Sequence, residues 1–164
     1  KRRKTNMLRE LQVIMGKPAV SSYKAGEETI TTGMAVVKNE TDKTFEFASA
    51  ETAADLYFVD KERIPTGINA ARENMSDYDA DFTTLVEGDF GKLINYLPGE
   101  RFATDAYVET GIVAGVRLSA NTAGKIVKAA TTVASKYVCG GFYTDNGHKL
   151  VIVEVSDTAD KNAS

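Results

Sequence analysis

The chain has 164 residues, a net charge of −3, one Cys, one His and no Trp. This length fits a single domain that can bury enough surface to fold without disulfide support. The single Cys excludes an internal disulfide framework and a cysteine metal cage. The net charge does not fit a protein that coats nucleic acid, and no apolar run approaches the ~20 residues of a membrane-spanning helix.

The chain begins with a basic run over residues 1–4, and apolar residues follow at helical spacing. This spacing predicts a short helix at about 6–15, which Gly16 and Pro18 would end. A helix of this length is marginal alone in water and needs a surface to dock on. We therefore predict an N-terminal arm over 1–19 that serves assembly, with a mobile tail or a phosphate contact as alternatives for the basic run. Its predicted partner-binding residues are Lys1, Arg2, Arg3, Lys4, Met7, Leu8, Leu11 and Met15.

The first half of the remaining chain predicts three strands and one long loop. Residues 29–38, with Gly33 as a candidate bulge, and residues 44–48 are rich in Thr, Val and Phe and flank a polar turn. Residues 56–59 predict a third strand. Residues 68–90 lack periodicity and carry many acids, so we predict a loop excursion there, since loops of this length are usually functional or disordered.

The second half predicts short strands at 92–97, 106–109, 115–118 and 125–128, and then a hairpin. Asn146-Gly147 between two β-rich runs is a strong hairpin signal. We expect one β-rich domain over 20–156, followed by a flexible tail over 157–164.

The many short strands predict a mainly β fold, a small β-barrel or β-sandwich. Residues 33–50 and 115–130 share an order of Gly, strand, turn, strand and Ala, which two hairpin modules would produce. We expect one β-core that contains Val36, Phe45, Phe47, Phe58, Val138 and Ile152.

No residue pattern indicates catalysis, so we predict a protein that is not an enzyme and has no cofactor. Asp77, Asp79 and Asp81 have the first spacings of a calcium loop, but Phe82 stands where that loop needs Gly. The Gly124-Lys125 pair lacks the Ser or Thr of a phosphate-binding loop and predicts a tight turn. His148 is expected to be solvated or locally hydrogen-bonded, and Cys139 to be a small buried hydrophobe.

Two segments, Gly26–Val37 and Gly115–Ala129, share an order of residue types, in which acids or Gly, a β-type run and a polar turn recur. Over about residues 20–155 this pattern resembles the head-decoration (capsid cement) proteins of tailed bacteriophages. The resemblance implies a compact β-barrel or β-tulip whose arms clasp the capsid lattice. It also implies a virion protein, made in the host cytoplasm, that binds the major capsid protein and neighbouring copies of itself as a homo-oligomer. Neither nucleic acid nor a membrane is expected as a partner.

Two other classes remain open. A glycan-recognising or host-surface-binding β-module would expose aromatic side chains over a groove, and the candidates are Tyr78, Phe82, Phe90 and Tyr96. An enzyme would need two carboxyl groups from residues 73–89 to converge in one pocket with perturbed pKa values.

Overall fold

The computed structural model describes residues 6–14, 22–26, 29–60, 84–145 and 147–163. The strands are β1 (Leu8–Gln12), β2 (Lys24–Ala25), β3 (Ile30–Thr31), β4 (Ala35–Asn39), β5 (Thr44–Glu46), β6 (Tyr57–Asp60), β7 (Thr84–Leu85), β8 (Lys92–Ile94), β9 (Arg101–Thr104), β10 (Arg117–Ala120), β11 (Ile126–Lys128), β12 (Ser135–Asp145) and β13 (His148–Asp160). The predicted mainly β fold is confirmed. Within these ranges there is no helix long and apolar enough to cross a bilayer.

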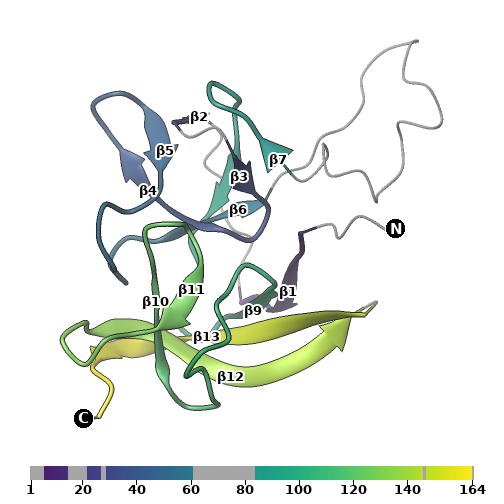
Figure 1. Cartoon of the computed structure of the whole chain (residues 1–164), viewed down its shortest axis with the longest axis vertical. Coiled ribbons are helices and arrows are strands. Elements are labelled where there is room, and N and C mark those ends of the chain that lie inside the picture. Colours follow the sequence, from purple (N-terminus) through teal and green to yellow (C-terminus); the bar gives the residue numbers. More distant parts are fainter. Residues whose placement is uncertain (1–5, 15–21, 27–28, 61–83, 146, 164) are drawn as a thin grey trace.

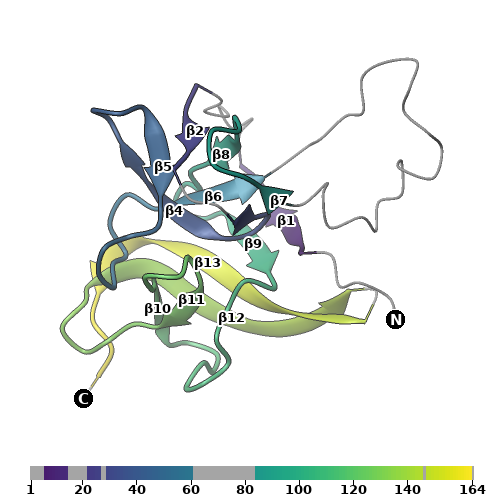
Figure 2. The ribbon, with the colours of Figure 1, turned by 45° about the horizontal axis from the view of Figure 1, so that its top comes forward.

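The strands form two main sheets and a small two-stranded ribbon (Figure 1). The larger sheet has the order β1-β9-β13-β12-β10-β11 and is antiparallel. It curls into a half-barrel, and Figure 2 shows its curvature from a second side. The second sheet has the order β2-β5-β4-β6-β8, and the third pairs β3 with β7.

The long β12–β13 hairpin forms the centre of the larger sheet. Asp145 pairs with His148, and Gly147 between them has a φ of 82°. Only glycine enters that left-handed region without steric cost, so the hairpin predicted from Asn146-Gly147 is confirmed. The register shifts between Cys139 and Gly141, where a β-bulge bends the strand.

Two separate apolar cores lie on opposite faces of the five-stranded sheet. Along β6, Phe58 faces a core between the two main sheets, while its neighbour Val59 faces a second core. Strands β4 and β8 alternate in the same way, and β2, β5 and the β3–β7 ribbon close the second core. The prediction of a single core is therefore wrong, because Val36 and Phe45 belong to the second core and Phe58 to the first.

Three predicted core residues are only half-buried, namely Phe47, Val138 and Ile152. Side chains alternate along a strand, and in β12 the residues that point inward are Tyr137 and Cys139. In β13 the inward-facing residues are Val151 and Val153. The predicted face of the hairpin was thus the wrong one.

The predicted helix at 6–15 is also wrong over its described part. Residues Leu8–Gln12 form the edge strand β1, whose backbone pairs with β9 from Leu8↔Thr104 to Gln12↔Arg101. Apolar residues at this spacing suit a short helix, but ten residues form an unstable helix on their own. Pairing with β9 satisfies the same backbone groups within an existing sheet.

The structure places several strand, loop and domain boundaries differently from the sequence predictions. Residues 106–109 contribute only an isolated bridge at Tyr107, and the strand lies earlier, at β9. Of the predicted loop 68–90, residues 84–85 form β7, and residues up to 83 lie outside the described ranges. Strand β13 continues past the predicted domain end at 156 to Asp160.

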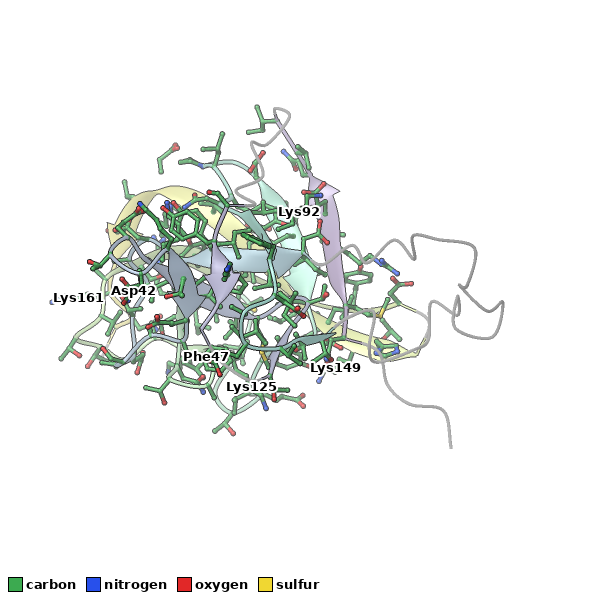
Figure 3. The ribbon with its side chains drawn as sticks, turned by 90° about the horizontal axis from the view of Figure 1, so that it is seen from above. Asp42, Phe47, Lys92, Lys125, Lys149 and Lys161 are labelled. Carbon is green, nitrogen blue, oxygen red and sulfur yellow. The ribbon has the colours of Figure 1, made fainter. Side chains whose placement is uncertain are left out.

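The internal similarity corresponds to two hairpins, β4–β5 and β10–β11. Each follows a glycine with a φ of 88°, Gly33 in one case and Gly115 in the other. The hairpins also pack together, since the Ala35 N–H donates to the Gly124 carbonyl at 2.8 Å. A Cβ on Gly124 would lie 2.5 Å from the Phe47 ring, and Phe47 and Lys125 are labelled in Figure 3.

Candidate functional site

The N-terminal segment runs along the edge of the six-stranded sheet and is fixed at both ends by carboxylates. At its start, the Met7 N–H donates to Asp105 Oδ1 at 2.9 Å, and the Asp105 N–H donates back to the Met7 carbonyl at 3.3 Å. At its end, the Ile14 N–H donates to Glu100 Oε1 at 3.2 Å. Because Glu100 is fully buried, its carboxylate needs these donors, and the Leu97 N–H supplies another at 2.7 Å.

The structure separates the predicted partner-binding residues into two groups. Met7 is buried in a small cluster with Ala103 and Leu150, and Leu8 packs against the core between the sheets. Leu11 is 43% exposed and is available to a partner. Residues 1–4 and Met15, which complete the predicted set, lie outside the described residues.

The sequence reasoning missed most of an apolar surface that this edge carries. We call it the apolar edge row, and its residues are Leu11, Val13, Ile14 and Leu97, each at least 43% exposed. Ile14 lies over the turn before β9, because a Cβ on Gly99 would meet Ile14 Cδ1 at 2.8 Å. A strand prediction for 6–15 would have suggested the exposure of Leu11, but Leu97 joins the row only through the pairing of β1 with β9.

Polar contacts from the β12–β13 hairpin surround the start of the edge. Arg9 Nε donates to Asp145 Oδ2 at 2.7 Å. His148 Nδ1 lies 3.8 Å from Asp105 Oδ2, the same carboxylate that binds the Met7 backbone. The acid beside His148 therefore also positions β1, and it is distant from His148 in the sequence, unlike the local partner or solvent expected for this residue.

A second polar cluster lies around Glu40, in the turn between β4 and β5. Lys38 Nζ and Lys43 Nζ each lie 3.1 Å from a Glu40 oxygen, and the Tyr23 hydroxyl donates to Glu40 as well. The hydrogen bond from Tyr23, followed by those from the two ammonium groups, lowers the pKa of Glu40 to about 2. The same bonds raise the pKa of Tyr23, Lys38 and Lys43. The carboxylate is therefore ionised at any ordinary pH.

The remaining candidates from the sequence are structural or lie outside the described ranges. Cys139 is 2% exposed, as predicted, and burial raises the pKa of its thiol. Gly124 closes a tight turn, in which its N–H donates to the Asn121 carbonyl at 3.1 Å. Asp77, Asp79 and Asp81 are not described, and the described residues contain no group of three or more metal-ligating side chains.

No family model, no curated protein and no solved structure matches the chain.

Proposed function

We propose that this chain is a non-enzymatic virion structural protein that binds and stabilises a capsid shell through the edge formed by β1. The observation that carries the proposal is the apolar edge row, in which Leu11 lies on the edge strand β1, Val13 and Ile14 follow that strand, and Leu97 precedes β9. Large apolar side chains gathered on a surface are typical of an interaction site.

An exposed edge strand can pair with a strand from another molecule through backbone hydrogen bonds. β1 pairs with β9 on one side, and no described strand pairs with its other side. Main-chain hydrogen bonds to an incoming strand would supply affinity, and the apolar edge row would supply buried area. Charges in the basic run would raise the association rate and make binding sensitive to salt.

The proposed partners are the major capsid protein and neighbouring copies of this chain on the capsid surface, after synthesis in the host cytoplasm. A rigid β-body of the β-barrel or β-tulip type suits this role, because many copies allow weak contacts to add up. The two carboxylates that hold β1 in register would present the edge in one conformation, which reduces the ordering cost of binding.

The test is a triple variant, Leu11→Ser, Val13→Ser and Ile14→Ser, in co-sedimentation with shells assembled from the capsid protein of the same genome. Loss of even ~60 Å² of buried apolar area costs about 1.5 kcal/mol, so binding should weaken roughly tenfold or more. The matched control is Val113→Ser, a 60% exposed position in the segment between β9 and β10. Both proteins should melt within ~2 °C of the parent, since exposed side chains contribute little to folding.

Equal binding by the parent and the triple variant would overturn the role of this edge. Absence of any binding by the parent, with neither a capsid gene nor a terminase gene beside its own, would overturn the virion assignment.

The glycan-binding alternative loses one of its predicted aromatic residues. Tyr96 is fully buried and stacks on Phe102 with 4.0 Å between ring centroids. Phe90 is 63% exposed, and Tyr78 and Phe82 lie outside the described residues. The aromatic groove predicted from the sequence therefore has no support at Tyr96.

A further inference from the structure

A pocket of about 410 Å³ opens at the end of the five-stranded sheet, away from the apolar edge row. Six residues line it: Val37, Lys38, Glu40, Ala54, Asp55 and Tyr57. They come from β4, from the turn after it and from the segment that enters β6. Its volume falls within the range of small-molecule sites, ~300–1,000 Å³.

The charges on one side of the pocket neutralise one another. Glu40 accepts from Lys38 and Lys43, and the Lys38 ammonium also lies 4.8 Å from the centroid of the Tyr57 ring. These contacts hold a carboxylate, an ammonium group and an aromatic ring in fixed positions before any ligand arrives. Such preorganisation lowers the cost of binding.

Asp55 supplies the group that is still available. It is exposed, with a φ of 50°, and no hydrogen bond or ion pair joins its carboxylate to another described residue. Few side chains adopt this conformation readily, although Asp is one of them. The pocket thus combines a free acceptor from Asp55 with the paired donor and acceptor of Lys38 and Glu40.

A buried hydroxyl lies near the same residues. Tyr137 is fully buried in the core between the sheets, and its hydroxyl has no hydrogen-bond partner in the described part of the chain. Burial raises the pKa of Tyr137, and interactions with Asp55 and Tyr57 raise it further, so this hydroxyl is within electrostatic reach of two lining residues. An unpaired buried hydroxyl costs stability unless it finds a hydrogen-bond partner.

We propose that this pocket binds a neutral sugar residue of a glycan. The lining residues Lys38, Glu40 and Asp55 carry a net charge of −1, and Lys43, which pairs with Glu40 from outside the lining, brings the cluster to zero, which suits a neutral ligand. Adjacent sugar hydroxyls can donate to the Asp55 and Glu40 oxygens and accept from the Lys38 ammonium, as charge-assisted hydrogen bonds. A C–H group of the sugar can contact Tyr57 beside the Lys38 ammonium, which lies over one face of the Tyr57 ring.

The test titrates the full chain with the methyl glycosides of glucose, galactose, mannose and N-acetylglucosamine, followed by amide shifts in ¹H–¹⁵N spectra. At least one should cause saturable shifts at Lys38, Asp55 and Tyr57, with a dissociation constant on the order of 1–10 mM for a ligand of this size. Asp55→Asn, which preserves shape, should weaken binding roughly tenfold. Glu87→Gln, which changes an exposed carboxylate after β7, is the matched control and should leave binding unchanged.

Three results would overturn the proposal. One is the absence of saturable shifts with all four probes. Another is equal loss of affinity in Asp55→Asn and Glu87→Gln. The last is saturable shifts with Nα-acetyl-lysine amide, whose side chain is cationic, and with no sugar. That result would make this a site for cations. Since the pocket does not include the apolar edge row, capsid binding by the Asp55→Asn variant reports on the proposed function separately.

Discussion

Glu40 and Glu100 are two carboxylates that organise their surroundings in opposite settings. Glu100 is fully buried, and backbone N–H groups of Ile14 and Leu97 satisfy it. Glu40 lies at the surface and is surrounded by side-chain donors. In both cases one charged group fixes segments that are distant in the sequence, which is how a residue sets the position of a site.

The first prediction concerns the pH dependence of the Glu40 cluster. The pKa of Glu40 is lowered to about 2, with the Tyr23 hydrogen bond as the main cause. A depressed carboxyl pKa means that the stabilisation is present above the ordinary pKa and is lost as pH falls through about 2. A carbon-13 NMR titration of the Glu40 carboxyl should therefore have a midpoint near 2 in the parent.

Tyr23→Phe should move this midpoint upward, toward the ordinary value of 4.5. Asp42→Asn is a suitable control. Asp42 lies in the same turn, but its carboxylate accepts from Asn39 and is not part of the Glu40 cluster. A Glu40 midpoint above 4 in the parent would show that the three donors do not act on this carboxylate together.

The end of β13 shows how an element can be held by a single side chain beyond it. Asn162 Oδ1 accepts from the Arg117 N–H at 2.7 Å, and its Nδ2 donates to the carbonyls of Arg117 and Ala129 at 3.0 and 2.6 Å. The side-chain amide of Asn162 thus makes the kind of backbone hydrogen bonds beside β10 that a paired strand residue would make. Arg117 also donates to the Thr158 carbonyl at 3.2 Å, so the C-terminal segment is tied to β10 from both directions.

We expect Asn162→Ala to destabilise the fold by about 1–3 kcal/mol, because it leaves backbone groups of Arg117 and Ala129 without their partner. Urea unfolding measures this change. Asn162→Asp keeps the acceptor but turns a carboxylate oxygen toward the carbonyls of Arg117 and Ala129, so it should destabilise the fold at least as much. A change below ~0.5 kcal/mol in both variants would mean that the segment after Asp160 is not held.

Elements that depend on local sequence signals were predicted well. Elements that depend on contacts between distant segments were not. The β12–β13 hairpin follows from Asn146-Gly147, whose effect is local. β1 was predicted as a helix because its apolar residues recur at helical spacing, and nothing near it in the sequence indicates the pairing with β9, whose neighbour Asp105 lies 98 residues from Met7. The pocket at Asp55 was missed for a similar reason, since its walls come from separate segments that only the folded sheet brings together.

At the scale of the whole molecule, the N-terminal strand is both a part of the body and the proposed contact with a partner. Its inner side covers the edge of β9, and Met7 closes a small cluster with Ala103 and Leu150. This differs from an arm that leaves the body unchanged when it is removed.

Deletion of residues 1–14 should therefore lower the melting temperature, by roughly 5 °C or more, because it removes the Met7 and Leu8 contacts and uncovers β9. Differential scanning calorimetry measures the change. Deletion of residues 1–4 alone serves as the control and should leave the melting temperature within ~2 °C. An unchanged melting temperature after the longer deletion would mean that β1 is only loosely attached to the sheet.

The pairing of Met7 with Asp105 has a consequence for synthesis on the ribosome. The β1 segment cannot find its place until a stretch 98 residues further on has been translated. At ordinary elongation rates of ~5–20 residues per second, that delay is roughly 5–20 s. For those seconds the nascent segment is open to chaperones or to a strand of another polypeptide, so this fold is exposed to mispairing during translation.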